Sequence, residues 1–199
     1  MVYLLARLAL GRFSSRLGRL THRYWLCDSA LVCIWVAVYF RFGVTIQSLA
    51  PAILALTAMV VSVVDFRFRL IPDRITIPLG VIGLLLTLVR QDISIIQSLI
   101  GGATGLTGFY LLATGGRMVL KKQALGGGDI KLLGALGLYV GWVGVIATAF
   151  LGAVLALVCL FSRRLLRHTD WHAPIPFGPF LTYAGVLWFL LGMADTLYF

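Results

Sequence analysis

Two aspartates, Asp65 and Asp129, are the residues of this sequence best suited to chemistry. All seven acidic residues of the 199-residue chain are aspartates, and these two lie where a charged stretch meets a long apolar segment, in VVDFRFRLIPD and GGGDIKLLGALG. A carboxylate at membrane depth is costly, so it is a functional-site candidate by default. The pattern predicts a paired-carboxylate site.

Two neighbouring carboxylates can divide the work of peptide hydrolysis between them. One, ionised, takes a proton from water, and the other, protonated, polarises the carbonyl group. Because neighbouring carboxylates do not easily both ionise, their protons leave in two steps that belong to the pair. We therefore predict that Asp65 and Asp129 are the catalytic residues of an aspartic peptidase within the membrane. Which of them is the base stays open.

The glycine run Gly126, Gly127 and Gly128 directly precedes Asp129. Residues without side chains let a substrate backbone approach closely and permit a positive φ angle, so we predict that these three bind substrate. A phosphate loop is a poor fit, because GGGDIK lacks the GK[ST] ending. The glycines of GGATGLTG, in contrast, are typical of a helix–helix contact surface in membranes.

Asp73 and Lys131 each have both a structural and a functional interpretation, whereas a segment near the C-terminus has a structural one. Asp73 precedes an apolar run and fits a helix N-cap, which we favour over catalysis. Lys131 can stabilise an ionised Asp129 or extend to the headgroups. Asp73 and Lys131 are nevertheless predicted substrate contacts. The segment PFGPF at 176–180 fits a rigid helix start.

The composition predicts an all-α membrane protein. Of the residues, 60% are hydrophobic and 12% are charged, and the mean hydropathy is +0.99. Apolar runs recur along the chain, so we expect a polytopic bundle of about seven transmembrane helices. The expected segments lie at about 26–42, 47–66, 75–89, 93–116, 130–141, 142–162 and 177–197. The division near Gly141-Trp142 is needed because 130–162 is too long for one crossing.

The basic residues give the orientation of these segments. With a cytoplasmic N-terminus, every lysine and arginine except Arg41 and Arg90 falls on the cytoplasmic side, as the positive-inside rule requires. The net charge of +10 is thereby explained by topology and lipid contact rather than by nucleic acid. In this topology the helix that ends at Asp65 reaches the cytoplasmic side, and the helix that begins at Asp129 leaves from that side. The two carboxylates are therefore expected at a similar depth in the membrane.

The chain divides into a leader and one domain. Residues 1–23 carry arginines and apolar residues at helical spacing on neighbouring stripes, which predicts an amphipathic helix on the cytoplasmic membrane surface. Residues 24–199 are expected to form a single transmembrane peptidase domain. The three cysteines and three histidines have no metal-ligand spacing, so we expect no metal site.

The motifs together resemble the prepilin peptidase family, the type IV leader peptidases, which are membrane aspartic proteases with a GxGD motif. An Asp followed by a basic stretch, IPD and T-x-P matches over 65–78, GxGD with KLL over 126–137, and PFGPFL near the C-terminus. The resemblance covers about residues 50–199. Presenilin-like enzymes also carry GxGD, but their first Asp follows Tyr, whereas Asp65 follows Val64.

The resemblance implies catalysis by Asp65 and Asp129 at the cytoplasmic face of the bacterial inner membrane. It implies removal, after a glycine, of the short basic leader of type IV prepilins or type II secretion pseudopilins. Many members also methylate the new N-terminus with S-adenosylmethionine, and those usually carry paired CxxC motifs. No CxxC occurs in this sequence, so we expect a peptidase without a cofactor, and S-adenosylmethionine only if methylation is retained.

Two other functions compete with the peptidase. A proton-coupled transporter would use the aspartates as a relay, but it predicts midplane polar residues and an internal repeat, and the sequence has neither. A non-catalytic assembly factor for a pilus or secretion machine predicts degraded motifs, and both motifs are intact. The peptidase is therefore the favoured hypothesis, with prepilins and membrane lipids as the expected partners.

Overall fold

The computed structural model describes residues 25–90, 92–120, 125–167 and 176–191, and within these ranges the only regular elements are helices. The predicted leader at 1–23 lies outside the described residues. In chain order the elements are α2 (Trp25–Phe42), η3 (Ile46–Ser48), α3 (Leu49–Phe68), α4 (Asp73–Thr87), α5 (Ile95–Ala103), η4 (Thr104–Gly108), α6 (Phe109–Leu120), α7 (Gly127–Arg167) and α8 (Gly178–Leu190). The prediction of an all-α fold is confirmed.

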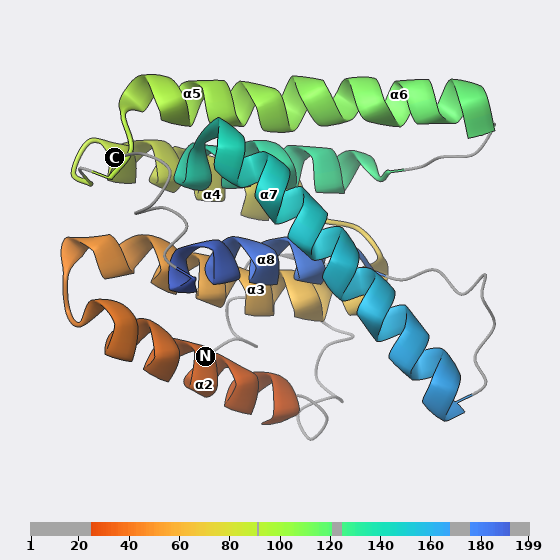
Figure 1. The fold of residues 1–199 in the computed structure, drawn as a ribbon, viewed down its shortest axis with the longest axis horizontal. Coiled ribbons are helices and arrows are strands. Elements are labelled where there is room, and N and C mark those ends of the chain that lie inside the picture. The colour runs from red at the N-terminus through yellow and green to blue at the C-terminus, as the bar shows by residue number, and fades with distance from the viewer. Residues whose placement is uncertain (1–24, 91, 121–124, 168–175, 192–199) are drawn as a thin grey trace.

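The long element α7 consists of two arms that meet at Gly141. Gly141 has φ 71° and ψ −176°, a conformation that glycine adopts at little cost. The chain reverses direction at this point (Figure 1), so residues 127–140 form a first arm and residues 142–167 a second. The predicted division near Gly141-Trp142 is confirmed, and the described helices match the predicted segments to within a few residues where both are described.

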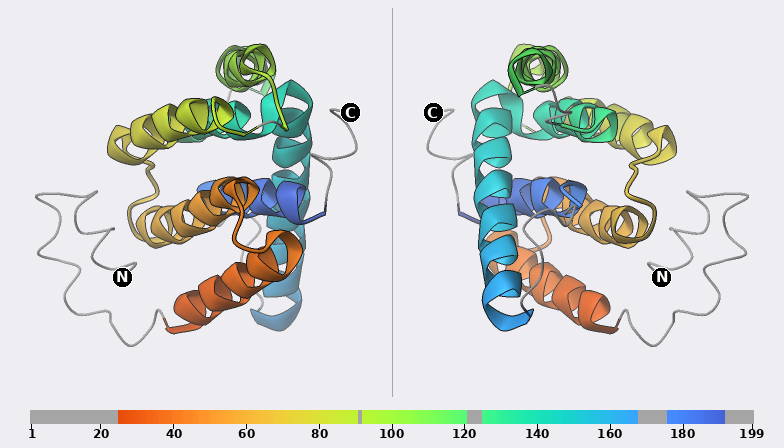
Figure 2. Two further views of the ribbon diagram at one scale, coloured as in Figure 1. Left: turned by 90° about the vertical axis from the view of Figure 1, so that its left-hand side faces the viewer. Right: turned by 90° about the vertical axis from the view of Figure 1, so that its right-hand side faces the viewer.

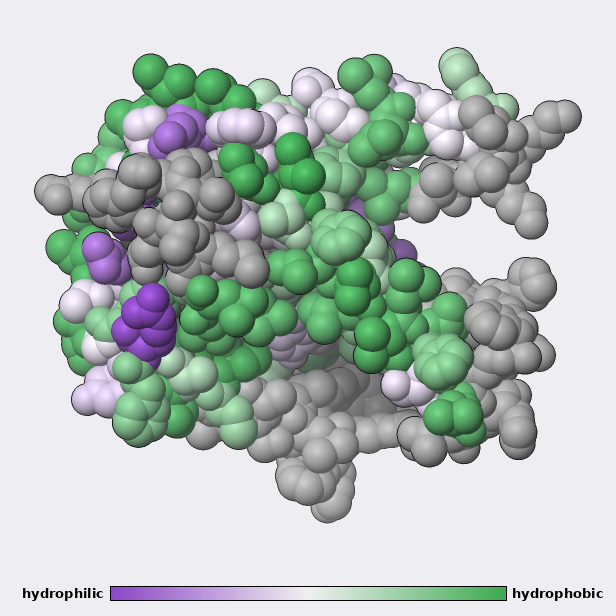
Figure 3. All heavy atoms as spheres, in the orientation of Figure 1, coloured by the Kyte–Doolittle hydropathy of each residue, from purple (hydrophilic) through white to green (hydrophobic). Residues whose placement is uncertain are grey.

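The helices have the length and surface of a membrane protein. Ile46–Phe68, Ile95–Met118 and Gly127–Ser162 are long and apolar enough to span a membrane, and Cys33–Phe42 and Gly178–Leu190 are shorter apolar helices. Large apolar side chains are exposed on the outer faces, as the green surface in Figure 3 shows. Such a surface suits lipid rather than water. The number of crossings stays a prediction.

The helices lie in layers that place four helix ends together. Two views at right angles show α5 and α6 outermost, then α4 with the first arm of α7, then α3 with α8, while the second arm of α7 crosses these layers (Figure 2). α3 ends, and α4, α7 and α8 begin, at the right-hand end of Figure 1. The ends that carry Asp65 and Asp129 therefore share one end of the bundle, as the predicted topology requires.

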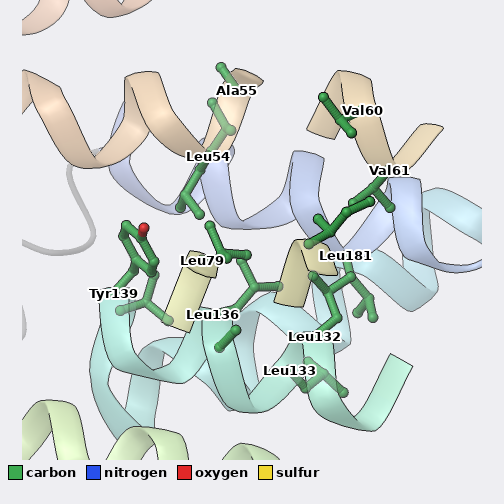
Figure 4. Packing of buried hydrophobic residues seen from close by; sticks show 14 of the residues in the cluster. Leu54, Ala55, Val60, Val61, Leu79, Leu132, Leu133, Leu136, Tyr139 and Leu181 are labelled. Carbon is green, nitrogen blue, oxygen red and sulfur yellow. The ribbon is translucent and has the colours of Figure 1, made fainter. Parts of the chain in front are cut away.

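The core lies where α3, α8 and the first arm of α7 meet. Its members are fully or almost fully buried apolar side chains from these helices and from α4 (Figure 4), among them Leu54, Val61, Leu79, Leu132, Leu136 and Leu181. Packing of this kind, rather than water exclusion between helices, is what holds helices together in lipid. The core thus fixes α7 against α3, the two helices that carry the aspartates.

Glycines allow α5 and η4 to approach the first arm of α7 closely. A Cβ atom on Gly101 would collide with the backbone of Gly137, and a Cβ on Gly137 would collide with the backbone of Gly101. One turn after Gly101, in η4, a Cβ on Gly105 would lie 2.6 Å from the carbonyl carbon of Leu133. The interpretation of GGATGLTG as a helix–helix contact surface is confirmed for its first three glycines, whereas a Cβ on Gly108 would meet only Thr104 of the same helical segment.

A buried polar network holds the far end of the first arm of α7. The Arg90 guanidinium is paired with the Asp92 carboxylate, with Nε 2.9 Å from Oδ1, and Nη1 donates to the Tyr139 carbonyl at 3.3 Å. Ser98 Oγ donates to the neighbouring Leu138 carbonyl at 2.7 Å. The last carbonyls of a helix lack intrahelical partners, and these bonds satisfy two of them.

Candidate active site

Asp65 lies in the last turn of α3 and is 5% exposed. Its Oδ2 accepts a hydrogen bond from the backbone N–H of Gly178, at 3.0 Å. Gly178 is the first residue of α8, so the carboxylate faces the N-terminal end of a helix. The partial positive charge at that end favours a nearby carboxylate. The cost of burying Asp65 is thereby partly offset by a backbone donor.

Gly178 is a site residue that sequence analysis assigned only to a helix start. A Cβ atom at this position would lie 2.9 Å from Asp65 Oδ2 and 2.7 Å from Ile71 Cδ1. Any side chain at 178 would therefore displace the carboxylate or the isoleucine. The PFGPF motif does begin α8, with Pro179 in its first turn. The same motif also supplies the N–H that donates to Asp65. A glycine flanked by two prolines was the sequence signal that could have suggested a close approach between this segment and another part of the chain.

Asp129 lies in the first turn of α7 and is partly buried. Its carboxylate lies against Gly126, where a Cβ atom would be 3.1 Å from Oδ2, and its own N–H donates to the Gly126 carbonyl at 3.1 Å. Each aspartate thus adjoins the backbone of a glycine. The two carboxylates also interact electrostatically with each other, so the structure brings the predicted pair together.

Ile71 connects the two halves of this site. It lies in the short connection between α3 and α4, and it is 7% exposed. A Cβ atom on Gly128 would lie 3.1 Å from Ile71 Cβ and 3.3 Å from its backbone N and O. The other end of the side chain reaches Gly178. The isoleucine therefore spans from the residue beside Asp129 to the residue bonded to Asp65.

The three glycines before Asp129 have three different environments. Gly126 adjoins the carboxylate, since a Cβ there would lie 3.1 Å from Asp129 Oδ2. Gly127 is exposed, and a Cβ atom there would meet nothing within 4 Å, whereas Gly128 faces the Ile71 backbone. Only Gly127 and Gly126 are thus positioned for close approach by another chain. Whether any of the three binds substrate stays a prediction.

Asp73 and Lys131 form an ion pair with each other. Lys131 Nζ lies 2.7 and 2.9 Å from the two Asp73 carboxylate oxygens, and both side chains are 52% exposed. The N-cap prediction for Asp73 is wrong, because Pro72 occupies that position without a side-chain cap and Asp73 begins the helix. In the structure Lys131 binds Asp73 rather than Asp129, since residues two apart point to opposite sides of a helix.

Other groups suited to catalysis or ligand binding are scattered. Within the described ranges, no three histidine, cysteine or acidic side chains gather as a possible metal site. The described site is therefore two carboxylates, the backbone of Gly126, the Gly178 N–H donor and the apolar side chain of Ile71. Paired carboxyl groups are the residue types that general acid–base hydrolysis of a peptide bond uses.

An apolar helical bundle with two aspartates meeting at one end defines a class of membrane proteins with a paired-carboxylate site. The model of the type IV leader peptidase family matches residues 52–161, a range that contains both aspartates. The match covers more than half of the chain. The protein therefore belongs to the type IV leader peptidase family, and the predicted resemblance is confirmed.

Curated relatives named prepilin leader peptidase/N-methyltransferase match most of the chain. The protein from Xanthomonas campestris pv. campestris is 32% identical over 85% of this chain and 59% of its own length. The protein from Aeromonas hydrophila is 29% identical over 94% of this chain and 64% of its own length. The protein from Pseudomonas aeruginosa is 31% identical over 95% of this chain and 66% of its own length. The chain thus spans less than two thirds of each of these relatives. No solved structure matches the chain significantly.

Proposed function

We propose that the protein is an aspartic endopeptidase that removes the short basic leader from type IV prepilins or type II secretion pseudopilins. The observation that carries the proposal is the meeting of Asp65 and Asp129 at one end of the bundle, where Asp65 accepts from the Gly178 N–H and Asp129 adjoins Gly126. The family to which the chain belongs and the printed names of its relatives support it.

The proposed reaction uses the two carboxyl groups in complementary protonation states. The ionised one takes a proton from water, whose oxygen attacks the scissile carbonyl carbon, while the protonated one donates a hydrogen bond to the carbonyl oxygen. When the C–N bond breaks, a carboxyl group gives its proton to the leaving amine. A buried pair favours the singly protonated state because the second ionisation would place two like charges together in a medium of low dielectric constant.

The substrate is proposed to approach from the cytoplasm. The ends of α3 and α6 and the start of α7 share one end of the bundle (Figure 1), and they carry basic residues such as Arg67, Arg117 and Lys131. Such residues mark the cytoplasmic side. The leader would then lie outside the membrane near Gly126, Gly127, Gly128, Asp73 and Lys131, and the apolar segment that follows it would lie in the membrane.

Leader removal from a tagged prepilin tests the proposal. We would co-express the substrate with the wild type, Asp65→Asn, Asp129→Asn and Asp28→Asn, and score the gel shift of the substrate in membranes. Asp28→Asn is the control, because it removes a carboxylate from the start of α2. We expect cleavage by the wild type and the control only, with all four proteins inserted. Normal cleavage by either site variant would refute the two-carboxylate mechanism.

Methylation is a separate proposal. The relatives' printed name includes N-methyltransferase, but the chain has no CxxC motif, so we propose that it cleaves the leader without methylating the new N-terminus and needs no S-adenosylmethionine. The mass of the mature substrate's N-terminus, after cleavage by the wild type, measures this directly. A product heavier by one methyl group would contradict the proposal.

A further inference from the structure

Ile71 lies between the residue that ends α3 and the residue that precedes α4, and its side chain points inward. Arg69 has φ 53° and ends α3 in the left-handed conformation, with its N–H bonded to the Asp65 carbonyl at 2.9 Å. Pro72, with φ −72° and ψ 146°, is the N-cap of α4. Between them Leu70 is 52% exposed, whereas Ile71 is 7% exposed. The connection thus points one large apolar residue outward and the next into the site.

The side chain of Ile71 lies between two glycines. On one side stands Gly128, next to Asp129, and on the other Gly178, whose N–H is bonded to Asp65. A methyl group on either glycine would have to displace Ile71, and one on Gly178 would also meet Val61 Cγ1 at 2.9 Å. Ile71 therefore occupies the volume between the two glycines that adjoin the carboxylates.

We propose that Ile71 determines specificity by excluding side chains from the substrate residue that lies beside the scissile bond. This inference rests on the proposed peptidase function. A peptide bond held between Asp65 and Asp129 must pass Ile71, which fills the space between the glycines at 128 and 178. A residue without a side chain fits there, and a larger residue meets the isoleucine. The glycine that the family resemblance implies before the cleavage point would thus be selected by Ile71.

The proposal predicts that a smaller residue at 71 relaxes the selection. Ile71→Val removes Cδ1, the atom 2.7 Å from the Cβ position of Gly178. Ile71→Ala removes the side chain beyond Cβ. One methylene group in an apolar pocket changes discrimination by roughly 10- to 200-fold. We expect the preference for glycine over alanine to fall about tenfold in Ile71→Val, and further in Ile71→Ala.

The experiment measures kcat/KM with the purified full chain on prepilins that differ only in the residue before the cleavage point, glycine, alanine or valine. For each variant we would take the ratio of kcat/KM on the glycine substrate to kcat/KM on the alanine substrate, because this ratio does not depend on the amount of folded enzyme. Leu79→Ala is the matched control, because Leu79 is an equally buried apolar residue of α4 in the core (Figure 4). We expect its ratio to equal that of the wild type.

Each outcome decides the matter. A lower ratio in both Ile71 variants, with an unchanged ratio in Leu79→Ala, supports the proposal. If Ile71→Ala does not fold, Ile71→Val alone carries the same comparison. An unchanged ratio in the Ile71 variants that fold, or an equal fall in Leu79→Ala, overturns the proposal while the peptidase function stands. A wild type that cleaves none of the substrates overturns the proposed function and this inference with it.

Discussion

The two ends of the first arm of α7 hold charged groups in different ways. At its start, the Asp129 carboxylate adjoins Gly126 and shares its surroundings with a second carboxylate, Asp65. At its far end, the Arg90 guanidinium is completely buried and is paired with Asp92, and it also donates to the Tyr139 carbonyl. One end concentrates like charges, and the other neutralises a charge.

This difference separates the part of the arm that anchors it from the part that can react. A buried charge with an opposite partner and satisfied hydrogen bonds holds its neighbours in place. Two like charges close together disfavour each other, so such a pair favours a state in which one carboxyl group holds a proton. The Arg90 network therefore holds the far end of the arm, and the proposed catalytic carboxylates lie at its start.

The largest effect is expected from removing a carboxylate at the start of the arm. Asp129→Asn keeps the shape of the side chain but can neither take nor give the proton, so we expect leader cleavage to slow by about 10²–10⁴-fold, the usual contribution of general acid–base catalysis. Single-turnover cleavage in detergent measures the rate, and thermal unfolding of the same samples measures stability. Slower cleavage accompanied by an equally large loss of folded protein would contradict a catalytic role.

The next effect is expected at the far end of the arm, on stability rather than on chemistry. Asp92→Asn leaves the buried Arg90 without its charged partner, and breaking such a pair usually costs about 3–5 kcal/mol. We expect a lower thermal unfolding temperature in detergent, with a cleavage rate per folded molecule close to that of the wild type. A rate that falls as far as in Asp129→Asn would show that the two ends are not separable.

The segment pattern and the break in α7 could be predicted because they follow from local rules. The apolar stretch 130–162 is too long to cross once, and its glycines suggested a division near Gly141; the structure places the break there, with φ 71° at Gly141. The shared end of Asp65 and Asp129 followed from the number of crossings between them and from the basic loops. These inferences need no knowledge of how the helices pack.

The partners of the site residues could not be predicted, because they depend on the rotation and depth of packed helices. The bond from Gly178 to Asp65 joins residues 113 positions apart, and the pair of Lys131 with Asp73 joins residues 58 apart. Hydropathy marks where a helix crosses but not which face meets which neighbour. Ile71 was missed for the same reason, since nothing in IPD indicates that its isoleucine turns inward.

A smaller effect distinguishes two adjacent glycines at the start of the arm. In Gly128→Ala the new methyl group would lie 3.1 to 3.3 Å from Ile71 atoms that include backbone, and overpacking of this kind costs about 1–3 kcal/mol. In Gly127→Ala the methyl group meets nothing within 4 Å. We expect the thermal unfolding temperature in detergent to be lower than that of the wild type for Gly128→Ala and close to it for Gly127→Ala. Equal unfolding temperatures would mean that Ile71 does not pack against α7 as described.

The smallest effect is expected for the ion pair at the same end as the carboxylates. Asp73 and Lys131 are each 52% exposed, and exposed ion pairs contribute about 0–1 kcal/mol. A double-mutant cycle of Asp73→Asn and Lys131→Gln, followed by thermal unfolding at low and high salt, measures their coupling. We expect a small coupling energy that salt reduces, because screening acts on exposed charges. A large, salt-independent coupling would place this pair with the buried Arg90 network and would remove the contrast between an anchored and a reactive end.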